Sequence, residues 1–387
     1  LSGASSLIAT FLARHPVLLD ELLDPRTLYA PPTRLELEEE IRFRIEQLPD
    51  DFEYIMDALR VYKQVNVLRV AAADITEVLP LMRVSDHLSD IAEVSVEEVL
   101  KMARQHLESK HGIPSGSSDG NRSTADFAVI AYGKLGGLEL GYGSDLDLVF
   151  LHSASDGQTI NGPNPIDNSQ YFARLGQRII HILTAHTQAG ILYETDMRLR
   201  PSGSSGVLVS HIDSFADYQM NTAWTWEHQA LIRARAVAGD PRLCDQFETI
   251  RKQALAICRD TEKLRAEVRE MRAKMRHELL QPGIKDFDIK QDTGGMVDIE
   301  FLVQYLVLSH ACDHEELLEW TDNVRLIHTL IDTGVVREMD AHILRHAYLI
   351  YRAVAHKLSL QEMPAQVPLE RFRLLRSKIE QIWNAFF

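Results

Sequence analysis

Two aspartates separated by one residue follow a Gly-Ser pair in the segment GSDLDLVF, residues 143–150. In an extended strand alternate side chains share a face, so Asp145 and Asp147 are expected to project together. Carboxylates are hard oxygen ligands for Mg²⁺, which completes its shell with substrate phosphates. The turn formed by Gly143 and Ser144 lets backbone N–H groups approach such phosphates. The segment indicates a metal-dependent nucleotide transferase, although an Asp-x-Asp pair alone is more often a solvated strand edge or a turn.

A second charged pattern lies in the segment ILYETDMRLR, residues 191–200, which is predicted to be a strand. Its polar face carries Glu194, Asp196, Arg198 and Arg200. An antiparallel strand with one wet face would show the same alternation. The types of charge indicate more, because Asp196 would complete a three-carboxylate metal cluster and the two arginines would clamp phosphates bidentately.

The elements that must position these residues follow from periodicity and turn signals. Apolar residues recur at helical spacing from residue 1 to about 111, and the Gly/Ser/Pro-rich run 111–123 is predicted to be a flexible linker and a domain boundary. Buried strands are expected at 127–132 and 146–151, and a helix with an apolar face is expected to stop at Gly190. The predicted regions are a helical N-terminal region (1–120), a catalytic domain (121–240) and a C-terminal helical bundle (241–387).

Two further segments supply weaker candidates. A helix is predicted over residues 224–235; its two tryptophans favour core packing, which leaves Glu227, Arg233 and Arg235 as secondary site candidates. Paired glycines at 294–295 precede an apolar helix, and their N–H groups could face an anion or simply form a hinge. Near these glycines the remaining candidates are Lys290, Asp298 and Glu300.

Length, charge and cysteine content limit the possible functions. A chain of 387 residues is expected to form two or three domains, and a net charge of −15 disfavours nucleic acid as a partner. No apolar run approaches the span of a bilayer, so no membrane association is predicted. The three cysteines are widely spaced without a CxxC pair, so neither a zinc site nor a disulfide is expected, and a reducing, cytoplasmic location fits. Because the chain opens on Leu1 and has no secretory signal, we expect it to be a piece of a longer protein.

Four segments together resemble one family. They are AYGKLGGLELGYGSDLDLVFL (131–151), YETDMRLRPSG (193–203), WTWEHQ (224–229) and GGMVDIEF (294–301), and the likeness continues to the last residue. The chain resembles the glutamine synthetase adenylyltransferases. The resemblance implies an α+β fold, mostly helical overall, in which a polymerase-β-like nucleotidyltransferase domain with a small mixed sheet is flanked by all-α regions. It also implies that Asp145, Asp147 and Asp196 are the metal carboxylates. For Lys134, Arg198 and Arg200, nucleotide-binding roles are inferred from charge and position.

The expected reaction moves AMP from ATP to a tyrosine hydroxyl of glutamine synthetase, with two Mg²⁺ ions, release of pyrophosphate and Asp196 as the base. The resemblance implies that this reaction lowers nitrogen assimilation, and that the PII signalling protein and glutamine regulate the full-length enzyme. Gly143 indicates the AMP-attaching half of the family, because the AMP-removing half usually has serine there.

Three other functions can be compared with this one. A P-loop or dinucleotide-binding protein is excluded, because Lys134 is not followed by Ser or Thr and Leu146 occupies the last glycine position of GxGxxG. Removal of AMP by phosphorolysis stays open. A non-catalytic regulatory nucleotide-binding module also stays open, although a module that only binds has no need of three metal carboxylates.

Overall fold

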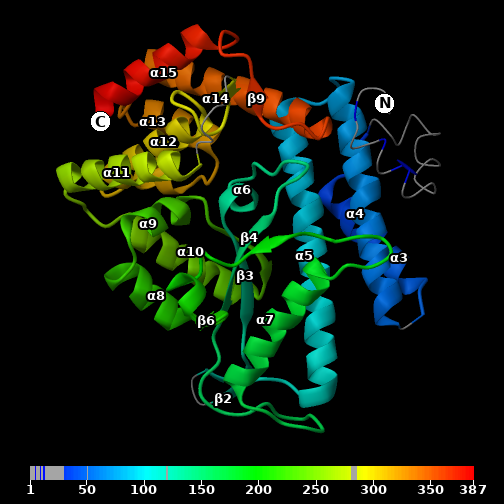
Figure 1. The fold of residues 1–387 in the computed structure, drawn as a ribbon. Coiled ribbons are helices and arrows are strands. Elements are labelled where there is room, and N and C mark those ends of the chain that lie inside the picture. The colour runs from blue at the N-terminus through cyan, green and yellow to red at the C-terminus, as the bar shows by residue number, and fades with distance from the viewer. Residues whose placement is uncertain are drawn as a thin grey trace. The chain divides into compact units, whose positions relative to one another are not determined.

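The computed structural model describes residues 30–49, 51–118, 121–279 and 286–387, together with residues 5, 9, 12 and 13. The chain forms two compact units (Figure 1). The sheet unit comprises Thr10–Thr222 and Ala234–Ile250, and the helical unit comprises Leu1–Ala9, Ala223–Arg233 and Arg251–Phe387.

Long helices precede the strands in the sheet unit, and their ends carry the expected local signals. Thr33 and Glu36 form a capping box at the first of these helices, and Asp51 caps the second through its side chain. The third ends at Gly112, whose φ of 81° favours glycine. The helical prediction is confirmed for the described part of this region, where α4 and α5 run side by side (Figure 1). The helices are α3 (Arg34–Glu46), α4 (Phe52–Ile75) and α5 (Leu81–His111).

A five-stranded mixed sheet lies at the centre of the sheet unit. Strand β3 pairs antiparallel with both β4 and β7, whereas β4 pairs parallel with β5 near its start and with β6 near its end. All five residues of β3 are buried, as expected for a continuous apolar run. Both predicted buried strands are confirmed. The strands are β3 (Phe127–Ala131), β4 (Leu146–His152), β5 (Thr195–Asp196), β6 (Val209–His211) and β7 (Arg235–Gly239).

Helix α7 (Asn168–Thr184) packs its apolar face on this sheet. Gly176 permits the close approach, because a Cβ there would lie 2.8 Å from a methyl carbon of Val209. The helix ends at Thr184, so the prediction that it runs to Gly190 was wrong; residues 187 and 190 instead bond to each other across a tight turn. The short helices of the unit are α6 (Gly133–Gly136), η2 (Gly203–Ser205) and α8 (Ile212–Asn221).

Two further local predictions fail in this unit. The run 111–123 is not simply a linker, because β1 (Ser115–Ser118) and β2 (Asn121–Thr124) pair as an antiparallel hairpin. The strand predicted over 191–200 is reduced to the two residues of β5, because the chain turns away after Asp196. The alternation of side chains correctly predicted the face of the strand on which Asp196 lies, but it overestimated the length of the strand.

The helical unit is organised around the apolar helix α12 (Met296–His310), which contacts most other helices of the unit. This helix and the charged helix α11 (Thr261–Leu279) confirm the prediction of a helical C-terminal region. Helix α10 (Pro241–Leu255) includes the boundary between the units at residue 250. The other elements are α9 (Thr225–Ile232), β8 (Phe287–Asp288), η3 (Glu315–Leu318), α13 (Asn323–Asp332), α14 (Glu338–Leu360), β9 (Gln366–Val367) and α15 (Arg373–Phe386).

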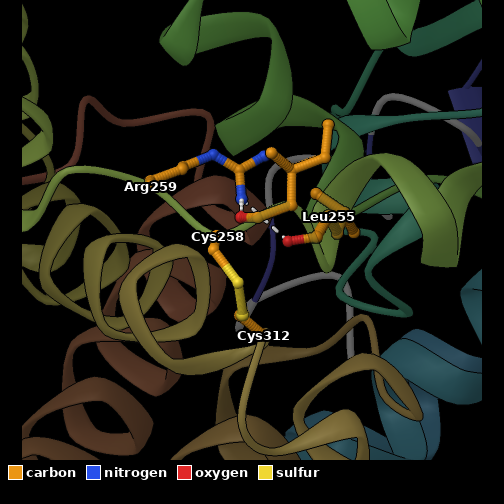
Figure 2. The surroundings of a disulfide bond; sticks show 5 residues. Leu255, Cys258, Arg259 and Cys312 are labelled. Carbon is orange, nitrogen blue, oxygen red and sulfur yellow. Dashed lines mark hydrogen bonds between the residues drawn. A yellow bond between two sulfur atoms is a disulfide. The ribbon is translucent and has the colours of Figure 1, made fainter.

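A disulfide joins Cys258 and Cys312 in the helical unit, so the prediction of no disulfide was wrong (Figure 2). It connects the segment before α11 to the segment after α12, with Cα atoms 5.1 Å apart. Beside it the Arg259 guanidinium donates to the carbonyls of Leu255 and Ile257, each at 2.8 Å. Sequence spacing missed the pair because the two cysteines meet only through the packing of the helices. Cys244 is a free thiol.

The described elements give a mostly helical α+β fold with a small mixed sheet, which confirms the predicted fold class. Within the sheet unit, α4, α5 and the strands share one apolar core that includes Leu59, Ile91, Phe127 and Phe150. The division at residues 120 and 240 stays a prediction. Among the described residues, no helix combines the length and the apolar character needed to cross a membrane.

Candidate active site

Asp145 and Asp147 lie at the start of strand β4, directly after a tight turn. Two hydrogen bonds close the turn: the Ser144 N–H donates to the Gly141 carbonyl (3.2 Å), and the Gly141 N–H donates to Ser144 Oγ (3.1 Å). Gly143 is exposed within the turn, Asp145 is exposed and Asp147 is half-buried. The turn therefore presents both carboxylates at the edge of a rigid, buried strand.

Asp196 joins them through the parallel pairing of β4 and β5. Leu146 lies opposite Thr195, and Asp147 lies opposite Asp196. Carboxylate oxygens of Asp145, Asp147 and Asp196 all lie within 4.8 Å of one another. The structure thus brings together the three carboxylates singled out in the sequence, and three oxygen donors at this spacing suit a hard divalent cation.

A glycine leaves room for this cluster. Gly133, at the start of α6, has φ of +56°, and a Cβ there would lie 2.1 Å from Oδ2 of Asp147. The neighbouring Tyr132 N–H donates to the Asp147 carbonyl at 2.9 Å, which holds the two segments together. Any larger residue at position 133 would have to displace the Asp147 carboxylate. Lys134 follows directly and is exposed on α6.

Arg198 grips the third carboxylate. Its N–H donates to Asp196 Oδ1 (2.8 Å) and its Nε donates to Oδ2 (2.7 Å). The hydrogen bond from the Arg198 side chain lowers the pKa of Asp196 most, and it outweighs the opposing effect of burial. The same carboxylate raises the pKa of Arg198, and the charges of Asp147 and Asp145 add to this rise. The guanidinium is therefore placed within the field of all three carboxylates while its side chain stays largely exposed.

Arg200 has a different environment from the one predicted. Its guanidinium donates to the carbonyls of Met197 (2.7 Å), Ser204 (3.2 Å) and Gly206 (3.3 Å). These bonds hold together the loop that follows β5. A role in clamping phosphate would compete with them, so Arg198 is the better-placed arginine.

Helix α4 fixes the segment that leads into β5, a feature that the sequence analysis missed. The buried Arg60 guanidinium donates to the carbonyls of Ile182 (3.0 Å), Ala185 (2.6 Å) and Gly190 (2.7 Å). Gln64, one turn further along α4, donates to the carbonyl of Ala189 at 2.8 Å.

Lys63 completes this set. Its Nζ donates to the Leu192 carbonyl (2.5 Å) and lies 3.9 Å from the centroid of the Tyr193 ring. Burial, with a smaller effect of the nearby Arg60 charge, lowers the pKa of Lys63 to about 8. The signal that could have revealed the set is its i, i+3, i+4 spacing, which places the three side chains on one face of the helix.

The secondary candidates are occupied with structural contacts. In the sheet unit Arg235 pairs with the buried Glu93, which also pairs with Arg34. In the helical unit Arg233 pairs with Glu300 at 3.2 Å. Glu227 accepts from the N–H of residue 224 at 2.9 Å and so caps α9. The prediction that the two tryptophans pack in the core was wrong, because the side chains at 224 and 226 are 69% and 36% exposed.

The paired glycines at 294–295 do not offer their N–H groups to an external anion. The Gly294 N–H donates to Oδ2 of Asp298 (2.7 Å), and the Gly295 N–H donates to the Asp292 carbonyl (2.9 Å). The Lys290 N–H bonds to the carboxylate of Asp288, two residues before it, at 2.8 Å. These contacts organise the entry to α12.

The fold and the carboxylate cluster together define a class. A small mixed sheet that presents clustered aspartates from the start of one strand and from its parallel neighbour is a nucleotidyltransferase-like arrangement.

Comparison with known proteins identifies the family. Residues 1–250 match the family described as glutamate-ammonia ligase adenylyltransferase, and the chain belongs to that family. Residues 262–371 match the family described as GlnD PII-uridylyltransferase.

Curated relatives agree over the whole chain. A protein named bifunctional glutamine synthetase adenylyltransferase/adenylyl-removing enzyme from Thioalkalivibrio sulfidiphilus is 54% identical over 386 residues, which is 99% of this chain and 40% of the relative. A protein of the same name from Nitrosococcus oceani is 50% identical over 387 residues, which is 100% of this chain and again 40% of the relative. The chain thus spans about two fifths of the length of these relatives.

Proposed function

We propose that this chain transfers AMP from ATP to a tyrosine hydroxyl of glutamine synthetase and releases pyrophosphate, and so lowers nitrogen assimilation. The observation that carries the proposal is the convergence of Asp145, Asp147 and Asp196 within 4.8 Å in a chain of this family. Arg198 pairs with Asp196, so Asp145 and Asp147 still repel each other and the third carboxylate unless a further cation is shared between them. Both relatives are named as glutamine synthetase adenylyltransferases, which supports glutamine synthetase as the acceptor.

The donor set fits Mg²⁺. All three residues supply oxygen atoms, and the glycine at 133 leaves the space beside Asp147 that a side chain would fill. We propose two ions, held by Asp145, Asp147 and Asp196, which would supply charge neutralisation for the triphosphate and for the attacking oxygen.

The side chains around the cluster have separate roles in the proposed reaction. In the proposed reaction a bond forms between the tyrosine oxygen and the α-phosphorus, and the bond from that phosphorus to the departing pyrophosphate breaks. Asp196 is the candidate acceptor for the phenol proton, but Arg198 lowers the pKa of this carboxylate, so it is a weak base. Its larger contribution is to hold charge and orient the hydroxyl. Lys134 and Arg198 are proposed to bind the phosphates together with the backbone N–H of Gly143, while Ser144 is proposed to shape the turn, because its N–H donates to the Gly141 carbonyl.

We also propose regulators and a cellular location for the enzyme. The match of residues 262–371 to a family named for PII uridylylation supports PII as a regulator of the full-length enzyme, with glutamine as a second regulator. ATP and a metabolic enzyme as substrates imply a cytoplasmic location.

Substitution of Asp147 by asparagine tests the proposal. The change removes one charged ligand while it keeps the size of the side chain, so AMP transfer should fall by at least about a thousandfold with the fold intact. Pyrophosphate release and AMP incorporation into glutamine synthetase measure the effect, and circular dichroism checks the fold. Asp156→Asn, at an exposed aspartate outside the cluster, is the matched control. A folded Asp147→Asn protein that labels glutamine synthetase at the wild-type rate would overturn the assignment.

A second candidate function is removal of AMP, because both relatives are also named as adenylyl-removing enzymes, and we propose phosphorolysis as its route. Incubation with adenylylated glutamine synthetase and phosphate, followed by measurement of released ADP, separates the two directions. AMP transfer without ADP release supports attachment. Nucleotide binding with neither product would identify a non-catalytic module.

A further inference from the structure

A small cavity in the helical unit is lined by three arginines of one helix face. Its volume is about 270 Å³, and its walls come from α11, the start of α12 and α15. Positions 269, 272 and 276 of α11 recur at i, i+3 and i+7, so their side chains share a face. The charged and aromatic residues that line it are Arg269, Arg272, Arg276, Asp298, Glu380 and Trp383.

The carboxylate of Asp298 is already fully engaged. It accepts from Arg272 Nε (2.6 Å), from Arg276 Nη2 (2.8 Å) and from the Gly294 N–H (2.7 Å). Two guanidiniums therefore share one carboxylate. Glu380 supplies the only other carboxylate among the residues that line the cavity, so the three arginines leave an excess of positive charge.

Donors of these arginines are left over. The Arg272 side chain is 1% exposed, and its Nη1 has no hydrogen-bond partner within the described part of the chain. Arg276 Nε is likewise buried and unpartnered among the described residues. Burial, more than the attraction of Asp298 can offset, lowers the pKa of Arg272. Buried cationic donors without partners cost free energy, which a bound anion would recover.

We propose that this cavity is a binding site for inorganic phosphate. A planar guanidinium presents paired donors that match the oxygens of a tetrahedral anion, and three of them converge here. The volume lies below the range of about 300–1,000 Å³ that is common for drug-sized ligands, so it suits a small ion better than a whole nucleotide. Arg269, exposed at the cavity and bonded to the Phe387 carbonyl at 3.1 Å, is placed to receive the ion. The site does not depend on the proposed adenylyl transfer.

Calorimetric titration of the full chain with inorganic phosphate tests the proposal. EDTA in the buffer removes divalent cations, so any binding that a cation at the aspartate cluster supports is absent. Arg269→Gln and Arg276→Gln should each weaken phosphate binding by on the order of tenfold, the effect of one charge-assisted hydrogen bond. Glu380→Gln should tighten it several-fold, because it removes a repelling charge.

Lys274→Gln is the matched control, since it removes a positive charge from the exposed part of the same helix, outside the cavity lining. It should leave the affinity unchanged. If Arg276→Gln fails to fold, as judged by thermal unfolding, Glu380→Gln still decides the matter because it leaves every arginine contact in place. Absence of binding at millimolar phosphate, or equal losses in Arg276→Gln and Lys274→Gln, would overturn the site. A parallel titration with AMP distinguishes the free ion from a phosphate ester. If AMP binds more weakly than inorganic phosphate, the cavity is a site for the ion itself. If AMP binds more tightly and this binding requires Arg276, the cavity is a site for a phosphate ester.

Discussion

At the scale of single residues, the candidate active site depends on one missing side chain and one added charge. Gly133 leaves the space that Asp147 occupies, and Arg198 lowers the pKa of Asp196 and holds its carboxylate through two hydrogen bonds. Gly133 acts from the start of α6 and Arg198 from the loop after β5, so short-range contacts set the geometry of the cluster. Substitutions at these positions should alter chemistry more than stability.

Gly133→Ala should abolish AMP transfer while most of the fold is retained. The new Cβ would displace Asp147 Oδ2, from which it would lie only 2.1 Å away. Gly190→Ala is the matched control, because Gly190 also has positive φ (94°) but meets nothing within 4 Å. Each change carries a backbone cost of about 1 kcal/mol, so urea unfolding should show similar small losses. Pyrophosphate release should separate the two variants, and equal activity in both would contradict this account of the cluster.

His152 should make stability depend on pH. Burial, followed by the charge of His211, lowers its pKa from the usual 6.5 to about 4, and its ring stacks on Phe172 with centroids 4.7 Å apart. Between those pH values the unfolded chain binds a proton that the folded chain refuses, so this contribution falls as the pH drops from 6.5 towards 4. The loss is on the order of 2–3 kcal/mol.

His152→Phe keeps the stacking and removes the titration, so its unfolding free energy should fall less over the same pH range. Urea unfolding at several pH values measures the difference. His181→Phe, at an exposed histidine of α7, serves as the control. Parallel pH curves for wild type and His152→Phe would contradict the prediction.

At the scale of elements, helix α4 does more than fill the core. Three of its side chains donate to carbonyls of the segment 182–192. This segment leads directly to Asp196, the third carboxylate. Strand β5 has only two residues, so its backbone hydrogen bonds to β4 are too few to fix the position of Asp196 by themselves. The helix supplies the missing constraint.

Arg60→Leu should destabilise the sheet unit by on the order of 3–5 kcal/mol, because several buried carbonyls lose a charged donor at once. It should also reduce AMP transfer, since the segment before β5 loses its anchor. Urea unfolding and pyrophosphate release measure the two effects. Arg83→Leu, at an exposed arginine of α5, should change neither, and a comparable loss in that variant would point to a general effect of charge removal.

The sequence predicted elements whose signal is local and missed those that depend on packing. The apolar runs that became β3 and β4 were found because buried strands need little else. The two-residue length of β5 was not found, because its end is set by the turn after Asp196 and by contacts from α4. The hairpin β1–β2 was mistaken for a linker, since its Gly/Ser composition carries no strand periodicity. The proximity of the three carboxylates was predicted by combining three signals, because the Asp-x-Asp spacing alone is weak: the shared face of Asp145 and Asp147, the charged face that carries Asp196, and the resemblance to the family.

At the scale of the whole molecule, the chain combines two compact units and covers 40% of the length of its curated relatives. The unit with the carboxylate cluster relies on a shared core of helices and sheet. The helical unit adds a covalent connection between segments 54 residues apart. The two units should therefore respond differently to reducing agents.

The disulfide can be tested by counting thiols. The unfolded, unreduced chain should react with one equivalent of a thiol reagent, at Cys244, and the reduced chain with three. Because the bond closes a long loop, reduction should lower the unfolding free energy of the helical unit by about 2–4 kcal/mol. Cys244→Ser should leave that loss unchanged. Three reactive thiols before reduction would contradict the pairing.

The parallel register of β4 and β5 limits how this region can change in length. Asp147 lies opposite Asp196 in this register, and the contacts from α4 to residues 182–192 hold the segment that precedes β5. A shift of β5 by one residue along β4 would bring Thr195 or Met197 opposite Asp147, and neither side chain carries a charge. An insertion or deletion between Leu192 and Asp196, beyond the last contact from α4, would therefore remove the third carboxylate from the cluster in a single step, whereas point substitutions there would leave the register in place.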